Sequence, residues 1–201
     1  MITKNEEKLL EKSIASVKSI VDEIIIVDTG SKDHTKEIAR KFTNKVFGFK
    51  FKDDFSEVRN FCISKATKKW ILVLDADERI NEKDLVKIKK LVKNKRYLGY
   101  RFIQKTKIKD KEYVRGICRL FQNNKGIRFV YPIHETVKNS IKELKGRIGS
   151  SGVVIEHLFR YNKDKKKLYF KLIKKKIKRF PDSNVLKEYE IEKNIVRDIM
   201  I

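Results

Sequence analysis

Two apolar runs of strand length, each followed at once by acidic residues, constrain the fold of this chain more than any other feature. "EIIIV" (23–27) leads into "DTGS", and "WILVL" (70–74) leads into "DADE" (75–78). Such continuous runs are typical of strands buried on both faces of a parallel sheet. Ligands of open parallel sheets bind beyond the carboxyl ends of the strands. We therefore expect both acidic loops to face one crevice.

Helical patterns separate the early strands. Thr3 and Glu6 have the spacing of a capping box, which predicts that a first helix begins near Asn5. Alternating strands and helices are typical of βαβ units, so we expect an α/β fold with a mostly parallel sheet flanked by helices. The expected helices are 5–20, 33–42, one from Asp54 and one capped by Asn81; the expected strands are 23–27, 45–49 and 70–74.

The pattern changes after about Arg96. Four further strands follow with short polar turns and no helix between them, which indicates a mixed or antiparallel second half; they are expected at 97–104, 112–122, 127–131 and 152–159. From Asn162 the chain is helical again, with one apolar stripe formed by Tyr169, Ile173, Ile177 and Phe180. Pro181 ends this helix, and a last helix is expected on Leu186, Tyr189 and Ile195.

The net charge of +23 suggests a polyanionic partner, but its distribution argues against specific nucleic-acid binding. Lysine supplies most of the 50 basic residues, whereas base and phosphate recognition favours arginine. Codon bias can explain much of the excess. The density of basic residues is higher over 163–179, which holds ten basic residues and one aspartate. This amphipathic segment is expected to pack on the domain, and peripheral contact with an anionic membrane is the alternative.

The apolar runs are too short to span a bilayer, and the N-terminus lacks the apolar core of a signal peptide. We therefore expect a cytoplasmic protein, soluble or peripheral at the inner face of the cell membrane. Cys62 and Cys118 are separated and lie in apolar patterns, so they are expected to be reduced thiols.

Asp75 and Asp77 are candidate ligands of a divalent cation. Side chains alternate along a strand, so the two carboxylates can point to one side and hold a hard cation together with water and phosphate oxygens. The alternative is that Asp75 forms a turn and Asp77 or Glu78 caps the next helix. The chain has no G-x-G-x-x-G after a strand, which counts against a dinucleotide dehydrogenase, and no P-loop, which excludes the P-loop NTPases.

Five blocks in order resemble the family-2 glycosyltransferases of the GT-A (Rossmann-like) fold: "TKNEEKLLEKSIASV", "VDEIIIVDTGSKDHT", "DDFSEVRNFCISKAT", "WILVLDADE" and "RLFQNNKGIRFVYPIHE". The bacterial branch with lipopolysaccharide-core and peptide glycosyltransferases is most similar. The resemblance implies an inverting transfer from a nucleotide-diphosphate sugar, usually a UDP-sugar, with Mg²⁺ or Mn²⁺ on the diphosphate. It implies a glycan, lipid-linked or peptide acceptor and a role in building the cell envelope.

The resemblance also implies roles for individual residues on the donor side. Asp28 resembles the residue that contacts the base or ribose, and Arg59 a basic residue near the phosphates. Asp75 resembles the aspartate of the D-x-D motif that faces the ribose or the metal, and Asp77 the principal metal ligand. The loop that borders the nucleotide corresponds to Lys4, Asn5 and Glu6.

An inverting transfer needs a base that deprotonates the acceptor. Glu135 is the candidate, with His134 beside it as a ligand for phosphate or acceptor; the alternative is a polar pair that organises a loop. His157 resembles a late histidine that reaches the metal in some relatives, although a core histidine is the simpler interpretation. His34 is expected to be exposed.

We expect a transferase domain over 1–160, with a nucleotide-binding half (1–95) and an acceptor half (96–160), and a basic helical extension over 161–201. Family members usually have more apolar residues before "KNEE", so the first strand here is expected to be short. A degenerate, inactive transferase and a non-enzymatic basic protein that binds nucleic acid or membrane stay open. A sugar nucleotidyltransferase is disfavoured because "TKNEEKLL" lacks its glycine-rich basic loop.

Overall fold

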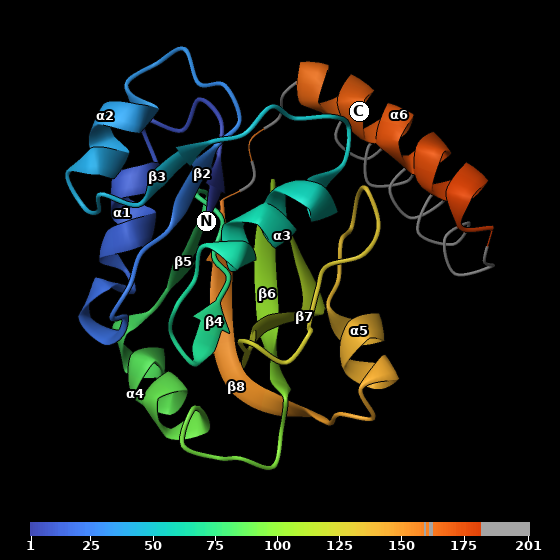
Figure 1. The fold of residues 1–201 in the computed structure, drawn as a ribbon. Coiled ribbons are helices and arrows are strands. Elements are labelled where there is room, and N and C mark those ends of the chain that lie inside the picture. The colour runs from blue at the N-terminus through green and yellow to red at the C-terminus, as the bar shows by residue number, and fades with distance from the viewer. Residues whose placement is uncertain (159, 161–162, 182–201) are drawn as a thin grey trace.

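The computed structural model describes residues 1–158, 160 and 163–181, and its strands form two sheets (Figure 1). One has three strands in the order β1-β2-β3, and the other five in the order β4-β7-β6-β8-β5. The elements are β1 (Ile2–Thr3), α1 (Leu10–Ala15), a 3₁₀ turn (Lys18–Ile20), β2 (Ile26–Asp28), α2 (Thr35–Arg40), β3 (Val46–Gly48), α3 (Phe55–Ser64), β4 (Trp70–Leu72), β5 (Glu78–Ile80), α4 (Glu82–Leu91), β6 (Gly99–Ile108), β7 (Lys111–Gln122), α5 (Lys138–Glu143), β8 (Ile148–His157) and α6 (Lys163–Arg179).

The three-stranded sheet is parallel, as the βαβ pattern predicts. Its buried side chains pack with α1 and α2 in one apolar cluster that includes Leu10, Ile14 and Ile26. At its carboxyl edge the in-register neighbours are Thr3, Asp28 and Gly48. The first acidic loop therefore begins where the sheet ends.

The five-stranded sheet is mixed. β6 and β7 form a long antiparallel hairpin, β8 runs parallel to β6, and β4 and β5 are the edges. Tyr100, Phe102 and Leu120 lie in its main core cluster, against which α4 contributes Leu85 and Ile88. The α/β fold with a parallel part and a mixed part is confirmed. The expectation that 70–74 is a strand buried in the parallel sheet was wrong, because β4 ends at Leu72 and pairs only with antiparallel β7 at the edge of the mixed sheet.

Helix α6 packs on the rest of the molecule through its apolar stripe, above α3 in Figure 1. Leu172 and Ile173 are buried against Ile133, and Lys171 Nζ lies 2.6 Å from Asp53 Oδ2. The predicted packing of this helix is therefore confirmed. The last helix expected on Leu186, Tyr189 and Ile195 lies outside the described residues. Within the described part of the chain, none of the helices is long and apolar enough to cross a membrane.

The start of the chain departs from the predicted helix 5–20. Thr3 is a strand residue whose carbonyl accepts the Thr29 amide at 2.9 Å, and Asn5 has φ +55°, which a right-handed helix does not allow. The capping-box interpretation was therefore wrong. The helix itself begins at Leu10 and ends in a 3₁₀ turn.

Three details of the second half also differ. No strand forms over 127–131, because the side chain of Asn60 in α3 makes both backbone hydrogen bonds of Phe129. Asn60 Nδ2 donates to the Phe129 carbonyl at 3.0 Å, and Asn60 Oδ1 accepts from the Phe129 amide at 2.8 Å. Helix α5 was not predicted. Glu78 does not cap α4, since it lies buried in β5 and Asn81 caps the helix as predicted, accepting the Lys83 amide.

Both cysteines are free thiols, as predicted: Cys118 is buried and Cys62 half-buried. Burial raises the pKa of Cys118 to about 11, so its thiol is protonated at neutral pH.

Candidate functional site

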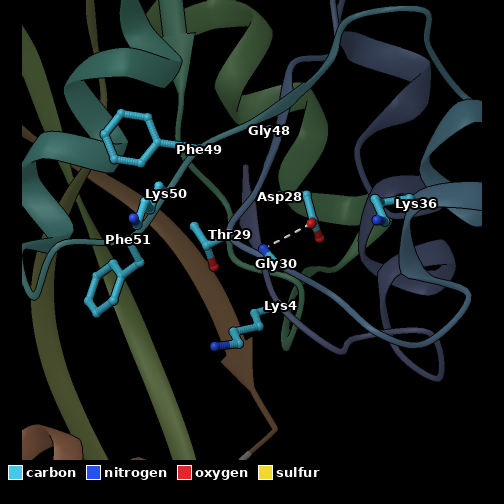
Figure 2. A pocket seen from close by; sticks show the side chains of 9 residues that line it. All are labelled: Lys4, Asp28, Thr29, Gly30, Lys36, Gly48, Phe49, Lys50 and Phe51. Atoms are coloured by element: carbon cyan, nitrogen blue, oxygen red, sulfur yellow. Dashed lines mark hydrogen bonds between the residues drawn. The ribbon is translucent and has the colours of Figure 1, made fainter.

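A pocket of about 500 Å³ opens at the carboxyl edge of the three-stranded sheet (Figure 2). Asp28, Thr29 and Gly30 form one wall, and the segment from Gly48 to Phe51 forms another. The remaining lining residues are Lys4 and Lys36. With three lysines and one carboxylate among its nine lining residues, the pocket suits an anionic or carbonyl-rich ligand.

Asp28 is fixed by the loop that follows it. Its Oδ1 accepts the amides of Gly30 at 3.0 Å and Ser31 at 2.9 Å, and its Oδ2 accepts the Ser31 hydroxyl. Gly30 has φ +104°, a conformation that glycine adopts without strain. Oδ1 already accepts two hydrogen bonds, whereas Oδ2 accepts one and has a lone pair left for a ligand.

Of the other residues predicted to border the nucleotide, Asn5 and Glu6 hold this loop in place. The Asn5 amide donates to Ser31 Oγ at 2.9 Å, and Asn5 Oδ1 accepts the Lys32 amide at the same distance. The Glu6 amide donates to Thr35 Oγ1 at 2.7 Å, and the Glu6 carboxylate pairs with Arg160. Lys4 is exposed and reaches the pocket directly.

Helix α1 connects the two acidic loops. Ser13, fully buried, donates its hydroxyl to the carbonyl of Asp75 at 2.9 Å. On the other side, Arg160 brings the end of β8 to Glu6. Asn5 and Glu6 thus hold the Asp28 loop, and Ser13 holds the Asp75–Glu78 turn. The residues that line the pocket do not include this turn, so a single crevice shared by both loops stays a prediction.

Asp75 is held by two buried arginines. Arg59 of α3 donates to both of its oxygens, at 2.9 and 3.0 Å, and Arg119 of β7 donates to Oδ2 at 2.7 Å. Burial alone would raise the pKa of Asp75, but the charges of Arg119 and Arg59 outweigh it and hold that pKa well below the ordinary value. Asp75 is therefore an anion whose oxygens face arginines.

The same network extends to both sides of Asp75. Arg59 also pairs with Glu135, so the candidate base lies one side chain away from the D-x-D turn. In the other direction, Arg119 donates to Glu78 Oε1 at 2.6 Å, and Glu78 accepts the Asp75 amide at 2.9 Å. Burial raises the pKa of Glu78, and the charge of Arg119 offsets this only in part.

Asp77 and His157 form the second pair of the turn. His157 Nε2 lies 3.6 Å from Asp77 Oδ2, while His157 Nδ1 hydrogen-bonds with Thr106 Oγ1 at 3.0 Å. His157 is only half-buried at the end of β8, so it is not a core histidine. A carboxylate and an oriented imidazole fit a divalent cation. Among the described residues no group of three metal-binding side chains gathers, so phosphate and water oxygens would complete the coordination.

The segment that carries Glu135 has an unusual backbone. Tyr131 and His134 have φ values of +80° and +50°, which are costly for residues with a Cβ. Ile133 of this segment is buried under α6, and the Pro132 carbonyl accepts the Phe55 amide at 3.0 Å. Strain of this kind is common in ligand-binding loops and persists where packing enforces it. The third histidine of the chain, His34, is exposed as predicted.

A sequence model of the family described as "Glycosyl transferase family 2" matches residues 1–141. The chain belongs to this family. It is 39% identical over 146 residues to a TPR repeat-containing protein of Synechococcus elongatus, a match that covers 72% of this chain and 36% of that protein. It is 31% identical over 145 residues to the SPbeta prophage-derived glycosyltransferase SunS of Bacillus subtilis, a match that covers 69% of this chain and 34% of that protein. The chain thus spans about a third of the length of these relatives.

Solved structures share the fold of this family-2 chain. Glucosyl-3-phosphoglycerate synthase from Mycobacterium tuberculosis, in complex with Mn²⁺ and UDP-glucose, has a TM-score of 0.62 at 14% identity, covering 90% of this chain and 78% of that one. S. aureus TarS 1–349 in complex with UDP-GlcNAc has a TM-score of 0.53 at 16% identity, covering 81% and 58%. At these identities the likeness establishes the fold.

Sequence reasoning missed Arg119 and misread Glu78 in this family-2 domain. Arg119 lies in "CRLF", where one arginine interrupts an apolar run of β7. A charge at a position that alternation assigns to the interior needs a buried partner, and that was the available signal. Two further members, Gln104 and Arg115, extend the network from Glu78 toward the surface.

Proposed function

We propose that the chain is the donor-binding and catalytic part of an inverting glycosyltransferase that uses a nucleotide-diphosphate sugar, namely a UDP-sugar. The observation that carries this proposal is the arrangement at one edge of the molecule. Asn5 holds the loop that forms the Asp28 pocket, and Ser13, a few residues on, holds the Asp75–Glu78 turn. Arg59 links this turn to Glu135. Nucleoside, diphosphate and acceptor would then bind in that order along one crevice.

Each predicted site residue has a place in this arrangement. The nucleoside binds in the Asp28 pocket beside Lys4, with Asn5 and Glu6 shaping its rim. Asp77 holds Mg²⁺ or Mn²⁺ with His157, and the cation neutralises the charge that develops on the leaving diphosphate. Asp75 and Arg59 form a fixed ion pair at the centre, close to the ribose or the phosphates. Asp75 can ligate the metal only if one of its oxygens gives up its hydrogen bond from Arg59 or Arg119.

Glu135 is the proposed base. It accepts the acceptor's hydroxyl proton as the oxygen attacks the anomeric carbon opposite the leaving diphosphate. Arg59 holds Glu135 in the described structure, so the carboxylate must exchange this hydrogen bond for one from the acceptor hydroxyl. His134, one residue away, is proposed to contact the acceptor or a phosphate.

The family and its structural relatives support the donor class. The Mycobacterium tuberculosis and S. aureus proteins were crystallised with UDP-sugars, the former also with Mn²⁺. The acceptor class is open between a glycan, a lipid-linked glycan and a peptide, and so is a role in the cell envelope. The domain boundaries, 1–160 and 161–201, stay part of this proposal; the family match covers residues 1–141.

The basic helix offers a second contact in this proposal. The apolar stripe of α6 is covered by the domain, so the exposed residues Lys167, Lys174 and Lys178 would act through charge and not through insertion. Co-sedimentation with vesicles that contain anionic lipids tests this peripheral contact. Binding at low salt that is lost at high salt supports it, and absence of binding at low salt rules it out.

Thermal-shift screening of nucleotide sugars with and without Mn²⁺ tests the enzymatic proposal. We expect one nucleotide sugar to raise Tm in the presence of Mn²⁺, because a ligand that binds only the folded state stabilises it. Asp77→Asn should lose this shift. Asp110→Asn, the same change at the exposed turn between β6 and β7, should keep it. Indifference to every nucleotide, or salt-sensitive RNA binding instead, would favour the inactive or non-enzymatic alternatives.

A further inference from the structure

Gly48 ends strand β3, and nothing in the protein explains why it is a glycine. Glycine weakens a strand because it has no side chain to pack and loses more chain entropy than other residues. Its usual reasons in a strand are a bulge, a sharp bend or a close approach of other atoms. The register between β2 and β3 is regular, which removes the bulge.

The other glycines each have a reason that Gly48 lacks. All eight glycines of the chain are described by the structure. Three have left-handed φ values, namely Gly30, Gly126 and Gly152. Four have a protein atom within 3.0 Å of the place where a Cβ would lie, namely Gly99, Gly116, Gly146 and Gly149. A Cβ on Gly48 would have no heavy atom within 4 Å, and its φ lies outside the left-handed region.

The free space beside Gly48 belongs to the Asp28 pocket. Gly48 and Asp28 are in-register neighbours of β3 and β2, and such neighbours project to the same side of a sheet. Both line the pocket of Figure 2. The residues on either side of Gly48, Phe47 and Phe49, contact Phe61 of α3, with ring centroids 6.3 and 5.0 Å apart. A side chain at position 48 would therefore enter the pocket beside the Asp28 carboxylate.

We infer that Gly48 determines the size of the group that binds beside Asp28, because this group occupies the space that a side chain would fill. The inference rests on the proposed function, in which the group is the nucleoside of the donor. The nucleoside then lies in van der Waals contact with the backbone of β3 at Gly48. Position 48 limits which nucleosides fit, independently of any hydrogen bond to Asp28.

The test is a graded series, Gly48→Ala, Gly48→Val and Gly48→Leu, with UDP titrated calorimetrically in the presence of Mn²⁺. Because the site is empty of protein atoms and branched residues suit strands, Tm should stay at or above the wild-type value. The Kd for UDP should rise with side-chain size, by roughly 10-fold or more for leucine, since overfilling a formed site is costly. Asn44→Leu is the control, because it adds the same side chain at an exposed position ahead of β3 and outside the pocket.

The outcomes separate the inference from the proposed function. Wild-type affinity for UDP in Gly48→Leu would overturn the role of Gly48 and leave the proposed function intact. A large fall in Tm of Gly48→Ala would also overturn it, because the glycine would then serve the fold. Failure of the wild-type protein to bind UDP or any nucleotide sugar would overturn the proposed function, and the inference with it.

Discussion

Asp75 receives three hydrogen bonds from two buried guanidinium groups, so its carboxylate is oriented before any ligand binds. The cost of burying Arg119 is offset because it faces both Asp75 and Glu78. Such a network gains little stability as a whole, but each member depends on the others. Single residues of this centre should therefore be far more sensitive to substitution than their surface counterparts.

Arg119→Met should lower the free energy of unfolding by about 3–5 kcal/mol, because it leaves the buried carboxylate of Glu78 and the half-buried one of Asp75 short of a positive charge. Arg128→Met is the matched control. Arg128 forms an exposed ion pair with Glu143, outside the buried network, so its loss should cost less than about 1 kcal/mol. Urea unfolding measures both. An equal fall in the free energy of unfolding in the two variants would show that the buried ion pairs of Arg119 contribute no more to stability than an exposed one.

At the residue level the sequence predicted that Asp28 and Asp75 lie at strand ends, because each directly follows an apolar run, and that Asp77 lies in the same turn as Asp75. It could not predict that Asp75 faces Arg59 and Arg119. These partners are 16 and 44 residues away in the sequence, and only the packing of α3 and β7 brings them together. A cap formed by Glu78 could stay open as an alternative for the same reason, since the burial of Glu78 depends on β8.

Polar contacts, as well as the apolar core, hold the segments next to β2, β3 and α3 together. Glu23, just before β2, pairs with Lys45 ahead of β3 and accepts the amide and hydroxyl of Thr67 after α3, both at 2.9 Å. Burial of this carboxylate would raise its pKa. The hydrogen bonds from Lys45 and Thr67 and the charge of Lys45 outweigh that effect and lower the pKa from 4.5 to about 2. The folded state therefore favours the ionised carboxylate.

A depressed pKa in the folded state stabilises the protein above the pKa of the unfolded chain, and this contribution is lost as the pH falls. For Glu23 the loss should occur between pH 4.5 and about 2. Glu23→Gln should be less stable than wild type at pH 7, and its free energy of unfolding should fall less steeply through that window. Glu37→Gln, an exposed counterpart on α2, should behave as wild type. If the free energy of unfolding falls with pH in parallel for Glu23→Gln and wild type, the result would contradict this role of Glu23.

The type and order of most elements follow from local patterns, and the exceptions have a physical cause. The strand expected at 127–131 was displaced by hydrogen bonds from Asn60, a contact that no local pattern encodes. The helix expected from Asn5 was shortened because Thr3 pairs with Asp28 in the sheet. In both segments, contacts with residues distant in the sequence outweighed the local preference for a strand or a helix.

At the scale of the whole molecule, two sheets supply different parts of one site. The parallel sheet contributes Asp28 and its pocket, and the edge of the mixed sheet contributes the Asp75–Glu78 turn. Helix α1, through Ser13, and the Glu6–Arg160 pair join the two parts. If a nucleotide binds in the pocket and a cation binds at Asp77, the two ligands should therefore affect each other's affinity.

Energetic coupling between UDP and Mn²⁺ tests this central claim most directly. The Kd of UDP should be measured by calorimetry with Mn²⁺ and with EDTA, for wild type, Asp77→Asn and Asp110→Asn. We predict that Mn²⁺ tightens UDP binding by roughly 10-fold or more in wild type and in Asp110→Asn, and that Asp77→Asn abolishes the difference. The same Kd for UDP with and without Mn²⁺ in wild type, or full coupling in Asp77→Asn, would contradict a single site built from both sheets.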